Sequence, residues 1–139
     1  MRYRHADVAL AVKRLQHRHH RALSQALQPL GLSLVQWDTL RHLANHPDAS
    51  LHDLAVLTFQ TDQSFGTLAA RMVDRGLIER VPGPGRAVRH RLTEKGAELR
   101  ATGQELVDVV VKTSFSRLSA AQLNELGALL DVALEEDPA

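Results

Sequence analysis

Side chains that could recognise a nucleic acid gather between Thr61 and Arg91. Gln63 carries an amide that can pair bidentately with adenine, and Arg71 carries a guanidinium that favours guanine or a phosphate. Serine and threonine hydroxyls can bond to any of the bases. This chemistry indicates contacts with base edges and phosphates, and the predicted DNA-binding residues are Thr61, Gln63, Ser64, Thr67, Arg71, Arg86 and Arg89.

Positive charge is concentrated where such contacts would be made. The whole chain has a net charge of only +1, but four arginines and no carboxylate lie between Arg80 and Arg91. Residues 101–139 are acidic, with two basic and seven acidic side chains. Because phosphate contacts need charges that reach the backbone, local density matters more than the total. We expect Arg86 to enter a minor groove, whose narrow form attracts arginine; a solvated edge strand is the alternative.

The eight histidines suggest a second kind of chemistry, metal binding. His42 and His46 are four residues apart and His17 and His20 three apart, spacings at which imidazoles can share a metal ion. No HExxH pattern, cysteine or clustered carboxylate accompanies them, so we predict no metal site and no cofactor. A metal-responsive regulator remains an alternative. An enzyme is not expected, because the chain has neither a nucleophile with its base nor a cofactor fingerprint.

An amphipathic helix and a hairpin are predicted to position the polar residues. The helix begins after Thr61, whose hydroxyl can cap it, and stops at Gly76, where positive φ is favoured. Its apolar stripe contains Phe65, Leu68, Ala69, Met72 and Val73. A strand over residues 77–81, the turn at residues 82–85 and a return strand over residues 88–92 follow, with His90 facing opposite to Arg89.

The flanking segments carry strong helix-start signals. Ser33 with Gln36 and Ser119 with Gln122 have the spacing of capping boxes, and Ser50 and Thr93 have the type and place of N-caps. A first helix is predicted from about residue 4 to residue 28, and a long helix after Thr93, with Gly103 as its weak point. The apolar seams of the first and the last two helices exceed what a small module can cover, which favours a homodimer.

The bulk composition sets outer limits. A chain of 139 residues with 44% hydrophobic residues fits one domain, residues 1–139. No apolar run is long enough to span a membrane, and the start lacks a secretory signal, so we expect a cytoplasmic protein without membrane contact. With no cysteine, thiol redox sensing and disulfides within the chain are excluded.

Several runs resemble the MarR family of bacterial transcription regulators. They are Leu54-Ala55, residues 61–64 (TDQS), residues 68–80 (LAARMVDRGLIER), residues 86–88 (RAV) and residues 92–96 (LTEKG). The resemblance implies a fold that is mainly α with a small β-hairpin, a winged helix-turn-helix over residues 33–92, and dimerisation helices at residues 1–30 and 93–139. The chain departs from the family at Phe59, where glycine is common, at Thr67, often basic, and at Pro84, often acidic.

The resemblance also implies a function. It is that of a homodimeric, sequence-specific regulator, most often a repressor, with a recognition helix in the major groove and a wing in the minor groove of a pseudo-palindromic double-stranded operator. A small aromatic or phenolic effector would bind between the dimer lobe and the DNA-binding lobe. The expected lining residues are His17, His20, Trp37 and Arg41. A winged-helix adaptor for protein interactions remains an alternative.

Overall fold

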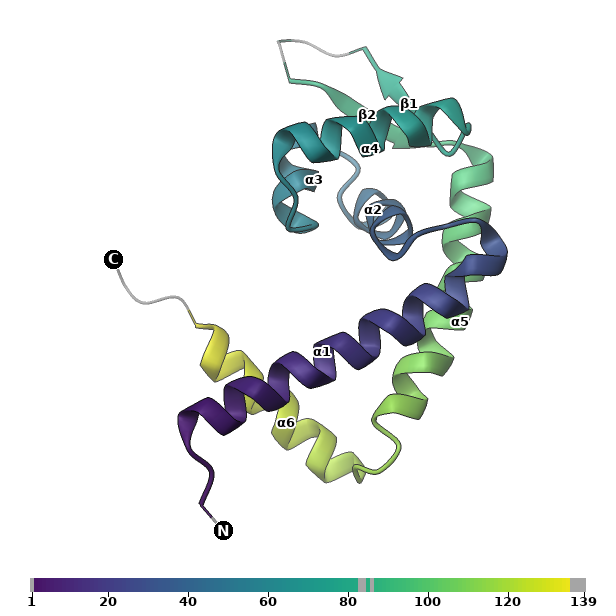
Figure 1. Cartoon of the computed structure of the whole chain (residues 1–139). Coiled ribbons are helices and arrows are strands. Elements are labelled where there is room, and N and C mark those ends of the chain that lie inside the picture. The colour runs from purple at the N-terminus through teal and green to yellow at the C-terminus, as the bar shows by residue number, and fades with distance from the viewer. Residues whose placement is uncertain (1, 83–84, 86, 136–139) are drawn as a thin grey trace.

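The fold is mainly helical with one antiparallel hairpin, as predicted (Figure 1). It is known from a computed structural model that describes residues 2–82, 85 and 87–135. The elements are α1 (His5–Leu27), the 3-10 turn η1 (Gln28–Leu30), α2 (Leu34–Asn45), α3 (Leu51–Leu57), α4 (Asp62–Asp74), β1 (Ile78–Val81), β2 (Arg89–Leu92), α5 (Glu94–Ser114) and α6 (Ala120–Leu134). The order agrees with the sequence prediction, apart from η1, which was not expected.

The helix starts form where the sequence signals predicted them. The Ser33 hydroxyl accepts the Gln36 amide at 3.2 Å, and the Gln36 side chain accepts the Ser33 amide at 3.0 Å. Ser119 and Gln122 repeat this reciprocal pair, and Thr93 caps α5 by accepting the amide of Gly96. Each cap satisfies backbone amides that have no partner within the helix. The boundaries are therefore fixed by interactions three residues apart.

The core lies in a compact unit made of α2, α3, α4 and the hairpin, which we call the winged lobe (residues 34–92; Figure 1). Phe65, Leu40, Leu54, Met72 and Ile78 are fully buried there. Leu27 from α1 and Val107 from α5 close the same core. The flanking helices are therefore anchored to the lobe through the end of α1 and the middle of α5.

Gly103 was predicted to weaken α5, but the structure gives it a packing role. The helix passes over the indole of Trp37 at this residue, and a Cβ on residue 103 would stand 2.5 Å from Trp37 Nε1. The indole N–H donates to the carbonyl of Arg100 at 3.1 Å. The absence of a side chain at Gly103 lets the two helices approach, so this glycine is required by a close contact.

The flanking helices α1, α5 and α6 leave apolar surface uncovered. No residue of α6 is buried. Large exposed hydrophobic side chains on these helices are Val8, Leu10, Val12, Val109, Leu123, Leu129, Leu130, Val132 and Leu134. Exposed hydrophobic side chains in this number on three helices favour a site of association. Among the described residues, none of the helices combines the length and the apolar character needed to cross a membrane.

Candidate nucleic-acid interface

Helix α4 presents a polar face opposite its buried stripe. Gln63, Thr67 and Arg71, spaced four residues apart, are all exposed, as is Ser64. The Thr61 hydroxyl accepts the amide of Ser64 at 3.1 Å, so Thr61 caps the helix. The structure therefore brings the helix residues predicted to bind DNA to one exposed face and to its N-terminal end.

The hairpin is joined to the winged lobe at its base. β1 and β2 pair in antiparallel register, with Val81 opposite Arg89. The half-buried Arg89 donates from Nη1 to the carbonyl of Asp48, and the amide of Leu51 donates to the carbonyl of Val88 at 2.9 Å. Arg89 is thus directed toward the loop between α2 and α3. The predicted contact residue Arg86 lies outside the described residues.

His90 sits inside this base. It is 3% exposed, and its Nδ1 has no hydrogen-bond partner among the described residues. Burial lowers the pKa of His90, and the nearby positive charge of Arg80 lowers it further. The neutral imidazole therefore packs as a nearly apolar ring beneath the wing.

A histidine–carboxylate contact that the sequence did not predict lies at the start of α4. His52 Nδ1, on α3, lies 2.8 Å from Asp62 Oδ1, in the first turn of α4. The hydrogen bond to Asp62 and its negative charge raise the pKa of His52. Both residues follow N-caps, and that shared position was the available signal, but only the tertiary fold brings the two helix starts together.

The four predicted effector-lining residues are not gathered in one pocket. Trp37 is 3% exposed and belongs to the core against Gly103, because α5 covers it. Arg41 pairs with Asp38 at 2.8 Å on the surface of α2. His17 and His20 are exposed on α1, and His17 lines a shallow groove along that helix.

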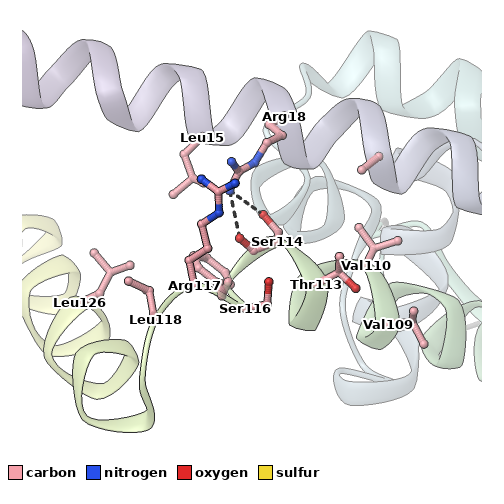
Figure 2. Close-up of a pocket in the computed structure, with 12 residues that line it drawn as sticks. Leu15, Arg18, Val109, Val110, Thr113, Ser114, Ser116, Arg117, Leu118 and Leu126 are labelled. Atoms are coloured by element: carbon pink, nitrogen blue, oxygen red, sulfur yellow. Dashed lines mark hydrogen bonds between the residues drawn. The ribbon is translucent and has the colours of Figure 1, made fainter.

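A pocket of about 780 Å³ lies instead among α1, α5 and the start of α6 (Figure 2). Its walls include Leu15, Val110, Leu118 and Leu126, and Arg18 and Arg117 contribute two guanidinium groups. Figure 2 shows the Arg117 side chain extending toward that of Arg18. The pocket therefore combines apolar walls with concentrated positive charge, which suits an anion with an apolar body.

Ser114 connects α1 to the end of α5 beside this pocket. Arg18 Nη2 donates to both the carbonyl and the hydroxyl of Ser114 at 3.0 Å, and His19 Nε2 lies 2.7 Å from the same hydroxyl. The His19 ring meets Phe115 edge to face at 4.9 Å. Burial first, and then Arg18, lowers the pKa of His19.

The histidine pairs on helices do not form a recognisable metal site. Across the described part of the chain, no three His, Asp or Glu side chains are grouped so as to hold a metal ion. His42 Nε2 lies 3.3 Å from Asp38, and its ring stacks on His46 with centroids 6.3 Å apart. Burial lowers the pKa of His42 despite the neighbouring carboxylate.

Comparisons with known proteins agree with this geometry. The MarR family profile matches residues 30–87. The HTH-type transcriptional repressor Rv2887 of Mycobacterium tuberculosis is 31% identical over 111 residues, covering 78% of this chain and 80% of the repressor. The crystal structure of Rv2887 with salicylic acid has a TM-score of 0.75 at 26% identity and covers 95% of this chain and 97% of that one.

A mutant E. coli MarR complexed with operator DNA has a TM-score of 0.84 at 21% identity, covering 92% of this chain and 94% of that one. At this sequence identity, the similarity to E. coli MarR shows a shared fold. The repressor match extends over most of both chains. The chain therefore belongs to the MarR family, whose winged helix-turn-helix fold it has.

Proposed function

We propose that the protein is a homodimeric, sequence-specific DNA-binding regulator that represses transcription in the cytoplasm and is not an enzyme. The observation that carries the proposal is the exposed face of α4, where Gln63, Thr67 and Arg71 stand on a helix whose other face is locked into the core. A rigid helix with such side chains suits readout of base edges in a major groove. The relative Rv2887 has been crystallised with DNA, which supports the same role here.

The uncovered flanking helices support the homodimer. A 15-residue helix with no buried residue gains little from the rest of its own chain, and most helices in proteins depend on packing of an apolar face. A second copy of α1, α5 and α6 offers the matching surface. Two-fold symmetry would set two α4 helices about one DNA turn apart, so the operator should be a pseudo-palindrome with half-sites ~10 bp apart.

Fluorescence anisotropy with the duplex upstream of the protein's own gene tests the proposal. We expect binding at least about a thousandfold tighter than to a shuffled duplex of equal length at the same salt concentration. Equal affinity for the two duplexes would contradict sequence-specific binding. Absence of binding to either, with retention of a protein partner, would instead favour the adaptor hypothesis.

We also propose that a small aromatic or phenolic anion releases the protein from DNA. The pocket between α1, α5 and α6 supports this, since Arg18 and Arg117 can balance a carboxylate while Leu15 and Leu126 contact a ring. Rv2887 has been crystallised with salicylic acid. A ligand held among the helices of the proposed dimer would favour one spacing of the two winged lobes over another.

Thermal-shift and anisotropy titrations with salicylate test the effector proposal. Salicylate should raise the melting temperature and displace the operator, and Arg117→Gln should weaken both effects. Lys112→Gln, which removes an exposed cation that does not line the pocket, is the matched control and should respond like the wild type. Equal responses of all three proteins would place the effector elsewhere.

A further inference from the structure

Phe59 occupies the turn that leads into α4 in an unusual conformation. Its φ is 59°, and among the described residues it is the only non-glycine with positive φ. Its side chain is 94% exposed, more than any other large hydrophobic residue described. The turn itself is held by backbone bonds, from Phe59 N to Val56 O at 3.2 Å and from Gln60 N to Ala55 O at 2.8 Å. The ring therefore makes no contribution to closing the turn.

The backbone conformation of Phe59 opposes folding of the isolated chain, and burial of the ring does not offset that cost. A left-handed backbone is strained for a residue with a Cβ, whereas glycine adopts it freely. An exposed aromatic ring keeps a large apolar surface in water, where it gains nothing from burial. A contact outside the protomer is the arrangement in which this ring would be covered.

The position of Phe59 indicates what would cover it. The residue lies two places before Thr61, the N-cap of α4, at the same end of the helix as Gln63 and Ser64. α3 and α4, which the turn joins, pack on each other, and α3 also packs on α2. The apolar surface assigned to the homodimer belongs to α1, α5 and α6. A duplex approached by the N-terminal end of α4 is therefore the nearest proposed partner.

We propose that Phe59 is a DNA contact that adds an apolar interaction beside the polar readout of α4, an inference that rests on the proposed function. DNA offers two apolar surfaces to such a ring, the C5-methyl of thymine in the major groove and the deoxyribose at its edge. Phenylalanine is one of the side chains suited to the thymine methyl. Because the ring carries no charge, its contact would raise affinity without changing the number of phosphates neutralised.

Operator titrations of Phe59→Gly, Phe59→Asn and Phe59→Tyr test the inference. The glycine and asparagine variants both tolerate positive φ, so neither should lower the melting temperature of the DNA-free protein. Both should bind the operator about tenfold more weakly, with the salt dependence of the wild type. The tyrosine variant keeps the ring and should bind within about twofold of the wild type.

Replacing each operator thymine by uracil, which lacks the methyl group, locates the contact. If one uracil replacement weakens binding by the wild type but not by Phe59→Gly, the ring contacts the methyl group of that thymine. If no replacement has this effect, the ring contacts a deoxyribose. If Phe59→Gly bound the operator as tightly as the wild type, the inference would be overturned. This is also the result expected if a protein partner covers the ring. A lower melting temperature in both variants would overturn it too, since the ring would then stabilise the turn. Failure of the wild type to prefer its operator would count against the proposed function instead.

Discussion

The indole of Trp37 rests on the bare Cα of Gly103, so that α2 and α5 are closer at this point than any residue with a side chain would permit. The contact joins the winged lobe to a helix that continues into the proposed dimer lobe. Any change in the angle of α5 must be accommodated by the indole, which is 3% exposed and bonded to the Arg100 carbonyl. This pair is therefore a close packing contact between the winged lobe and α5.

Replacing Gly103 with alanine should destabilise the protein. The added methyl would collide with a rigid ring, and overpacking of a filled core costs about 1–3 kcal/mol. Urea denaturation followed by tryptophan fluorescence measures the change. Gly66→Ala is the matched control, because among the described residues no atom beyond the adjacent backbone of α4 lies within 4 Å of a Cβ at residue 66, and it should stabilise α4 by up to about 1 kcal/mol. Equal or higher stability of Gly103→Ala would show that α5 can shift without cost.

Arg71→Ala should weaken operator binding in a salt-dependent way. Arg71 is exposed in the last turn of α4, where a guanidinium can bind a phosphate or guanine. If it binds phosphate, the slope of log affinity against log salt should fall by about 1. Lys112→Ala, an exposed cation near the end of α5, should leave the slope unchanged. An unaltered slope with relaxed preference at one base pair would assign Arg71 to a base instead.

Aspartate at both Leu129 and Leu130 should disrupt the homodimer. These side chains are 60% and 38% exposed in the protomer, and a charge in an apolar interface loses its hydration without gaining a partner. The dimer dissociation constant, measured by sedimentation equilibrium, should rise about tenfold or more. Operator affinity should fall as a result. Asp131→Asn, on the same helix, should remain a dimer. A dimeric double variant would exclude this face of α6 from the interface.

His90→Leu should reduce the loss of stability at acidic pH. The pKa of His90 is lowered by burial and by Arg80, so below about pH 6.5 the unfolded chain takes up a proton that the folded chain resists. Stability contributed by the neutral ring is therefore lost as pH falls. Urea midpoints at about pH 5 and about pH 7.5 should differ less in the variant than in the wild type.

His52→Gln is the control of opposite sign. The pKa of His52 is raised by Asp62. The contribution of His52 to stability is therefore complete below about pH 6.5 and is lost as pH rises through the pKa of His52 in the folded protein. Removing it should make the acid-side loss of stability slightly steeper. If His90→Leu and His52→Gln changed the pH profile in the same direction, His90 would not be the buried neutral group.

Features that depend on neighbours in sequence were predictable from the sequence. The capping pairs Ser33–Gln36 and Ser119–Gln122 formed as expected, because each is a reciprocal bond across one helical turn. The buried stripe of α4 and the positive φ of Gly76 also follow from periodicity and from a helix end. The sequence alone therefore indicates which side chains of residues 61–81 are exposed and which are buried.

Features that depend on distant segments could not be predicted. Trp37 is a predicted effector contact because it lies on one of the first two helices, which mix apolar and polar side chains. Its close packing against Gly103 of α5 depends on a tertiary contact that no local pattern indicates. The bond from Arg89 to the Asp48 carbonyl and the pair of His52 with Asp62 likewise join segments that share no local pattern. The pocket containing Arg117 depends on where α6 leaves α5.

No residue of α6 is buried in the protomer, so DNA binding by the proposed homodimer would depend on protomer concentration. In the proposed homodimer, α6 acquires its packing only on association, so dilution shifts material toward chains with a frayed C-terminal helix. Binding to a two-fold operator then depends on the square of the free protomer concentration. Such a regulator would leave its operator unbound at low copy number and would occupy it over a narrow range of expression. Its melting temperature would rise with protein concentration.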